Sequence, residues 1–416
     1  MACSAVRSPI LRNSAVRHYA TATATQTSAA TCLETKLLNN KVIAVSLDNN
    51  NPVSQVSIIF RAGPRNETYH TQGISHHLRI AAGLTTCRSS YFGITRNIQQ
   101  LGGNIIATSD RESIAYTLQV TRNNLDQALQ FLEDVATQQV FKPWEISDQL
   151  PRLRYELSRI PETTRLLELL HRTAYRSGLG NSLYSPKRQV GKISSESLQH
   201  FVNSWFTGSR CAVVATGVPF SKICSFASAL NVKSSDACDQ PAKYYGGELP
   251  LAVLQRALGT GPQVKWGSSA SPLYKTVSGI AGKQSFAVSA FNAVYSDSGL
   301  FGFIICSEPS IAGSITACTY KLLKSLHLSD ADINRGKNAL KADILYATEN
   351  DIGLLEILRQ QALFKGQVCT AQEIVASVDK INASDVKNVA GKLGSGKPSL
   401  AAIGDICSVP NLDELS

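Results

Sequence analysis

The sequence predicts an α+β protein made of two similar lobes, and three observations support this prediction. The chain has 416 residues, whereas single hydrophobic cores stop growing at roughly 250 to 300 residues. Several stretches recur at a constant offset of 188 positions. Each copy also shows the same order of β-branched runs and amphipathic helical patterns. We therefore expect two lobes, each a mainly antiparallel sheet packed with helices.

The repeat covers about fifty residues without a change of offset. Segments 167–178, 190–193 and 211–216 recur 188 positions later, at 355–366, 378–381 and 399–404. In the first pair, the sequence LELLHRTAYRSG aligns with LEILRQQALFKG. A fixed offset over this length is typical of a duplicated domain. We expect 211–216 and 399–404 each to close its lobe as a strand.

The first copy supplies a full set of expected elements. Its β-branched runs, the alternation of its apolar residues and one amphipathic face support each assignment. In chain order these are strands at 42–47 and 53–60 around the turn NNNP, a helix at 74–82, a strand pair at 105–108 and 114–120, and a helix at 124–138.

The second copy departs from this order at its start. Its first expected helix, at 251–258, follows the polar stretch 231–247 directly, with no alternating β-branched run to match 42–60. We therefore expect the second lobe to lack its opening strands. The predicted organisation is a transit segment at 1–19, a lobe at 20–230, a linker at 231–247 and a shortened lobe at 248–416.

The amino-terminal residues have the composition of a mitochondrial transit segment. No acidic residue precedes Glu34, while Arg7, Arg12 and Arg17 lie among Ser, Ala and Thr. The sequence Arg17-His18-Tyr19-Ala20 resembles a matrix-peptidase cleavage site, so we expect the mature chain to start near Ala20. A basic tail without a targeting role is the alternative.

The charge balance is modestly basic. The chain has 41 Lys and Arg against 31 Asp and Glu; without the three arginines of the transit segment the balance is 38 against 31, a net charge of +7. No basic run is interleaved with aromatic residues, which argues against a nucleic-acid groove. Apolar stretches such as 211–220 fall far short of the roughly 20 residues that span a bilayer. We expect any membrane association to be peripheral.

One segment carries the trace of a catalytic motif. The residues 73–80, GISHHLRI, together with the repeat and the transit segment, resemble the pitrilysin family of zinc peptidases. Active members carry H-x-x-E-H on a helix: the two histidines hold zinc and the glutamate activates the metal-bound water. Here His76 occupies the first position, Arg79 the base position and Ile80 the second ligand position.

The altered motif predicts a chain without peptidase activity. Arginine accepts no proton at neutral pH and isoleucine has no lone pair for a metal. The resemblance places a further carboxylate ligand on a later helix, and Glu156 is its candidate. The remaining alternative is a weak metal site made of His70, His76, His77 and Glu156. No haem, nucleotide or iron–sulfur motif is found, so we expect no cofactor.

The resemblance also implies a biological setting. Within the family it is strongest to the non-catalytic core subunits of mitochondrial ubiquinol:cytochrome c reductase, over the blocks 73–86, 102–116, 181–184, 243–248 and 289–302. It implies a structural role on the matrix side of the inner membrane, paired with a core-1-like paralogue and supporting the cytochrome b, cytochrome c1 and Rieske subunits. The alternative is the substrate-binding, non-catalytic subunit of a presequence-processing metallopeptidase.

Overall fold

The first lobe is built on a six-stranded sheet. The computed structural model describes residues 32–233, 248–265 and 270–415. The sheet has the order β1-β2-β6-β3-β5-β4. Its strands are β1 (Cys32–Leu37), β2 (Ile43–Asp48), β3 (Val53–Phe60), β4 (Asn104–Ser109), β5 (Ile114–Thr121) and β6 (Cys211–Thr216). The strands predicted in this lobe are confirmed, whereas β1 was not predicted, because its sequence CLETKL lacks an apolar alternation.

The closing strand β6 lies between the two strands that were expected to open the lobe. It pairs in parallel with β2 and antiparallel with β3. The other edge of β3 pairs antiparallel with β5 along its whole length. β6 therefore depends on two neighbours, and β3 is the strand that joins it to the β4–β5 hairpin.

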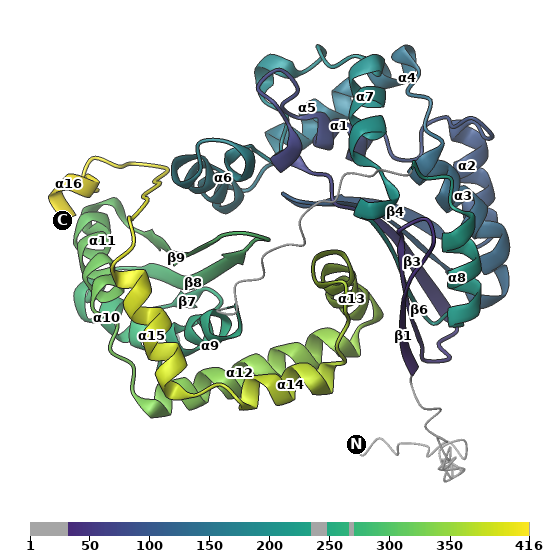
Figure 1. The fold of residues 1–416 in the computed structure, drawn as a ribbon. Helices are drawn as coiled ribbons and strands as arrows, with labels where there is room; N and C mark the ends of the chain where they lie inside the picture. Colours follow the sequence, from purple (N-terminus) through teal and green to yellow (C-terminus); the bar gives the residue numbers. More distant parts are fainter. Residues whose placement is uncertain (1–31, 234–247, 266–269, 416) are drawn as a thin grey trace, which may run out of the picture. The chain divides into compact units, whose positions relative to one another are not determined.

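Helices cover one face of this sheet with a single apolar cluster (Figure 1). The helices of this lobe are α1 (Ile74–Ile80), α2 (Tyr91–Gln100), α3 (Leu125–Thr137), α4 (Pro143–Asp148), α5 (Leu150–Ser158), α6 (Glu162–Ala174), α7 (Ser195–Trp205) and α8 (Phe220–Ala229). Alternate residues of β3, including Ile58 and Phe60, enter the cluster fully buried. Phe60 stacks on Phe206 with ring centroids 4.2 Å apart.

The second lobe has a smaller sheet. Its order is β7-β8-β9, with β7 (Gln263–Val264), β8 (Phe286–Val294) and β9 (Gly299–Ser307). The helices are α9 (Glu248–Leu258), α10 (Pro272–Ala281), α11 (Pro309–Lys324), α12 (Asp330–Glu349), α13 (Asp351–Lys365), α14 (Ala371–Asp379), α15 (Ala383–Gly394) and α16 (Leu412–Leu415). A separate apolar cluster joins α9, α10, α11, α12, α14 and α15 to β8. The α+β architecture of two lobes is thus confirmed.

The expected closing strand of the second lobe was wrong. Residues 399–404 form no strand, although the matching segment of the first lobe is β6. The physical reason lies in the pairing of β6, whose two neighbours are β2 and β3. The described part of the second lobe contains no counterpart of either, so residues 399–404 have no ladder to join.

Helix α13 connects the lobes by covering the second face of the first sheet. Leu355, Leu358 and Ala362 are buried against Ile59 and Val214 of that sheet. At its start, Asp351 accepts hydrogen bonds from the side-chain amide of Asn51, at 2.8 Å. A helix counted with one lobe therefore completes the packing of the other. None of the helices in the described residues is long and apolar enough to cross a lipid bilayer.

Candidate functional site: a metallopeptidase motif closed by protein side chains

Helix α1 carries the altered motif, and a buried carboxylate fixes its first turn. Gly73 precedes the helix with a φ of 93°, in the left-handed region that favours glycine. The backbone N–H groups of Gly73 and Ser75 each donate to the Glu67 carboxylate at 2.8 Å. Burial raises the pKa of Glu67, and these two donors oppose that rise. Helix starts leave N–H groups unpaired, so Glu67 sets where the motif residues lie.

His76 is fully buried and held at both ring nitrogens. Its Nδ1 accepts the backbone N–H of Ser185 at 3.1 Å, and its Nε2 lies 3.2 Å from Oε2 of Glu156. Because Nδ1 is an acceptor, this pattern assigns the ring proton to Nε2, which donates to Glu156. Burial lowers the pKa of His76 to about 4. The ring is therefore neutral at pH 7, with its outward nitrogen protonated.

Arg79 supplies the positive charge that Glu156 needs. Its Nη2 donates to Oε2 of Glu156, and Nε of Arg152 lies 3.5 Å from Oε1. Burial raises the pKa of Glu156, but the hydrogen bonds from Arg79 and His76 outweigh it and leave that pKa below its ordinary value. The carboxylate is therefore ionised and paired with guanidinium groups.

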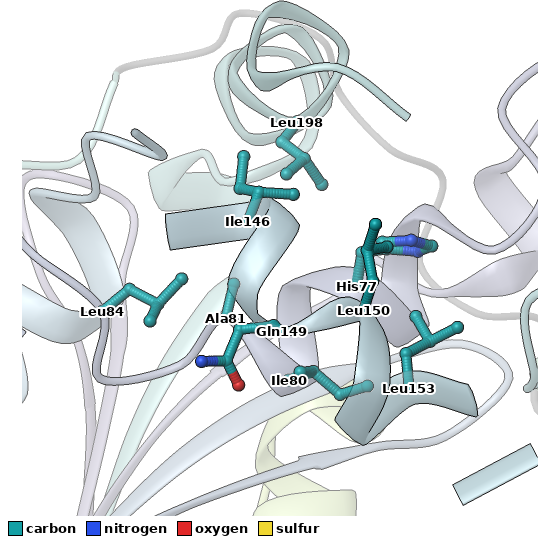
Figure 2. A pocket seen from close by; sticks show the side chains of 9 residues that line it. All are labelled: His77, Ile80, Ala81, Leu84, Ile146, Gln149, Leu150, Leu153 and Leu198. Atoms are coloured by element: carbon teal, nitrogen blue, oxygen red, sulfur yellow. The ribbon is translucent and has the colours of Figure 1, made fainter. Parts of the chain in front are cut away.

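Ile80 fills the second ligand position with hydrocarbon. It is 2% exposed and lines a hollow of about 10 Å³ between α1, α4, α5 and α7 (Figure 2). Leu153 and Leu198 lie on the same wall. This volume is about that of one water molecule. The hollow next to the altered motif thus has no room for a polypeptide substrate.

His77 points away from the His76–Glu156 pair. Its Nδ1 donates to the carbonyl oxygen of Gly73 at 2.8 Å, and its buried Nε2 faces the small hollow without a hydrogen-bond partner among the described residues. Burial lowers the pKa of His77. The two imidazole centroids are 6.5 Å apart with the rings inclined at 71°. The exposed His70 contacts Tyr69, and the four residues of the weak-site alternative are not gathered around one point.

The residues at this position do not fit a zinc ion. Ile80 offers no lone pair, the Nε2 of His76 carries a proton, and a guanidinium occupies the carboxylate. Within residues 32–233, 248–265 and 270–415, no group of three or more His, Cys, Asp or Glu side chains is placed to hold a metal ion. The structure therefore offers no step through a metal.

Sequence reasoning brought His76, Arg79 and Glu156 together but missed their supports. Glu67, Arg152 and the backbone of Ser185 complete the hydrogen bonding. The spacing of Arg152 and Glu156 by four residues on a helix was a usable signal for that ion pair. The expected cleavage residues Arg17, Tyr19 and Ala20 lie outside the described residues, as does most of the predicted linker.

The chain around this site is strongly basic. Residues 150–192, which include α5 and α6, contain nine Lys or Arg and three Asp or Glu. Among them, Arg152 and Arg188 are exposed. A surface of this sign attracts anionic partners and repels basic peptides.

Comparison with known proteins gives the family. Residues 42–187 match the family model described as Insulinase (Peptidase family M16), and residues 241–340 match the Peptidase M16 inactive domain. The chain is 36% identical to the cytochrome b-c1 complex subunit 2, mitochondrial, of Homo sapiens and of Rattus norvegicus, over 92% of this chain and 91% of each relative. It is 26% identical to the mitochondrial-processing peptidase subunit alpha of Solanum tuberosum, over 88% of this chain and 81% of that protein. The chain belongs to the insulinase family of peptidases, family M16.

Proposed function

We propose that this chain is a non-catalytic structural subunit of the mitochondrial cytochrome b-c1 complex, which transfers electrons from ubiquinol to cytochrome c. The observation that carries the proposal is the 36% identity to subunit 2 of that complex over 92% of this chain. The similarity spans both lobes. It therefore concerns the whole fold and not an isolated motif.

The arrangement around Glu156 supports a role without catalysis. A metallopeptidase needs a metal with an open coordination position and a base beside it. Here Arg79 stands at the base position and pairs with Glu156, while Ile80 closes the second ligand position. The residues that would bind and activate water instead bind one another.

The proposed place of the chain is the matrix side of the inner membrane. Arg7, Arg12 and Arg17 in an acid-free amino-terminal segment support import, with removal of residues 1–19 and a mature chain starting near Ala20. Its proposed neighbours are a core-1-like paralogue and the cytochrome b, cytochrome c1 and Rieske subunits. The chain would contribute to assembly and stability of the complex without binding a redox cofactor itself.

Affinity purification from mitochondria tests this proposal. The tagged chain is extracted in mild detergent, and its partners and its zinc content are measured in the same sample. We expect recovery of the cytochrome b-c1 subunits in amounts equal to the chain, without zinc. A soluble two-chain assembly that contains zinc and no cytochrome b would contradict the proposal.

A second function has one specific observation in its favour. The chain resembles the mitochondrial-processing peptidase subunit alpha of Solanum tuberosum at 26% identity over 88% of its length, so a substrate-binding half of a processing peptidase is the rival. Presequences are basic and need an acidic surface, whereas residues 150–192 carry a net charge of +6. The charge of this region opposes the rival.

Fluorescence anisotropy with a labelled basic presequence peptide separates the two functions. The structural proposal predicts no saturable binding at physiological ionic strength. Saturable binding that is enhanced by a second peptidase-like subunit, with cleavage of the peptide, would favour the processing role.

A further inference from the structure

Strand β9 is an open sheet edge in the described part of the second lobe. It pairs with β8 along all nine residues, Gly299–Ser307, and the sheet order β7-β8-β9 leaves its other side without a strand. The unpaired N–H and C=O groups of such an edge are a template for another strand. The second lobe therefore presents a backbone acceptor surface.

This edge lacks the features that protect the edges of the first sheet. The edge strand β1 carries the charged Glu34 and Lys36, and the other edge, β4, is short and carries Asn104 and Thr108. β9 reads GLFGFIICS, without charge or proline. Natural proteins place charges, prolines or short strands at edges that face solvent. The composition of β9 is that of a strand with neighbours on both sides.

The first lobe shows which neighbour is missing. β5 holds the same place as β9, as the second strand of a hairpin followed by a long helix. The far edge of β5 carries β3 in antiparallel register, from Val53 opposite Thr121 to Phe60 opposite Ile114. The counterpart of β3 would thus lie antiparallel to β9.

A second segment waits for the same neighbour. Residues 399–404 correspond to β6, which pairs antiparallel with the opposite edge of β3. In the structure they form no ladder, and the Ile403 side chain is 43% exposed. One inserted strand with two free edges would join β9 to residues 399–404.

We propose that β9 and residues 399–404 accept an extended segment of a partner chain as an inserted, antiparallel strand in the position that β3 has in the first lobe. The segment needs about eight residues with alternating apolar side chains, because it must match the pleat of β9. A second copy of this chain is not the occupant: its own β9 already uses one edge for β8 and has only one left.

Hydrogen exchange of the full chain with a model strand tests the proposal. The probe is a synthetic peptide of the chain's own β3 sequence, VSQVSIIF, flanked by lysines for solubility. At about ten times its dissociation constant, we expect the exchange of backbone amides in both β9 and residues 399–404 to slow about tenfold. A peptide of the same composition in scrambled order is the control and should leave both segments unchanged.

Two blocked peptides make the test specific for an inserted strand. N-methylation of one set of alternate amides closes one edge of the peptide, and methylation of the other set closes the other edge. Each is expected to remove the protection of one segment and to keep that of the other. The proposal is wrong if the parent peptide slows neither segment, or if β9 becomes protected by self-association as the chain is concentrated. Neither result bears on membership of the cytochrome b-c1 complex.

Discussion

At the scale of single residues, Arg79 gives Glu156 the positive charge that a divalent cation gives in an active metallopeptidase. The guanidinium and the protonated Nε2 of His76 meet on the same carboxylate oxygen. A buried carboxylate without such partners would be costly. The altered motif is thus a satisfied structural contact, and its loss should be measured as stability.

Replacing Arg79 tests this contact. Arg79→Ala leaves a half-buried carboxylate with one donor fewer, and we expect the free energy of unfolding to fall by about 1 to 3 kcal/mol. The control is Arg154→Ala, since Arg154 is exposed on the same helix as Glu156 and should change stability by less than about 0.5 kcal/mol. Urea unfolding followed by circular dichroism measures both, and equal losses would show that the contact has no special role.

The buried histidines predict a loss of stability in acid. The pKa of His76 in the folded chain is about 4, below the ordinary value of about 6.5, so the unfolded chain binds a proton first as the pH falls. Between pH 7 and pH 5 we expect His76 alone to remove about 2 kcal/mol of stability. His77 and His171, whose pKa values burial also lowers, act in the same direction.

Urea midpoints at pH 7 and pH 5 measure this effect. His76→Gln should show a smaller acid loss than the parent chain, whereas His200→Gln, at an exposed position, should keep the full loss. A parent chain that is equally stable at both pH values would contradict the neutral assignment of His76.

Restoring the motif should not restore a protease. Arg79→Glu with Ile80→His recreates H-x-x-E-H, but the new histidine enters a hollow of about 10 Å³ walled by Leu153 and Leu198. We expect weak zinc binding and no cleavage of presequence peptides. Zinc-dependent turnover in that double variant, measured by a fluorogenic peptide assay with a chelator control, would show that the other parts of a catalytic site are intact.

At the scale of elements, the repeat pairs α6 with α13 but gives them different surroundings. Leu355 and Leu358 on α13 are 3% and 2% exposed against the six-stranded sheet. Their counterparts 188 positions earlier, Leu167 and Leu170, are only partly buried. The difference follows from the smaller second sheet, which offers less surface to cover.

Matched truncations measure that asymmetry. Leu358→Ala removes a buried side chain and should lower the free energy of unfolding by about 2 to 5 kcal/mol. Leu170→Ala, at the equivalent position, should cost less than half as much because its side chain is already partly solvated. Thermal and urea unfolding of the two variants give the comparison, and indistinguishable losses would mean that α6 is covered as fully as α13.

Local patterns predicted the elements whose partners are close in sequence. The hairpin of β4 and β5 and the amphipathic helix α3 follow from alternation and from the stripe of Leu125, Leu129 and Leu132. Long-range packing was not predictable in this way. Nothing in the sequence of α13 says that Leu358 lies on the first sheet, and residues 399–404 look like a strand although their neighbours are missing.

The same division holds for the candidate site. The spacing of His76, Arg79 and Ile80 on one helix was readable because helical periodicity is local. The Glu156 contact was expected from family resemblance. The amide of Ser185, which sets the tautomer of His76, comes from a loop distant in sequence, and no pattern pointed to it.

At the scale of the whole molecule, contacts far apart in sequence join the two lobes. The turn between β8 and β9 places Ser296 against Glu112 of the first lobe: its N–H and hydroxyl donate to that carboxylate at 2.9 and 2.6 Å. Arg65 pairs with both Glu112 and Asp297. Together with α13, these contacts favour a rigid scaffold, which suits a structural subunit better than a chain that opens to admit substrate.

The most direct test of a structural role is to deplete the chain in mitochondria and to measure the amount of assembled cytochrome b-c1 complex by native electrophoresis, with presequence cleavage followed in the same samples. Our account predicts that the assembled complex and its ubiquinol:cytochrome c activity fall in proportion to the chain, while precursor cleavage continues. An unchanged amount of complex together with accumulating uncleaved precursors would contradict it.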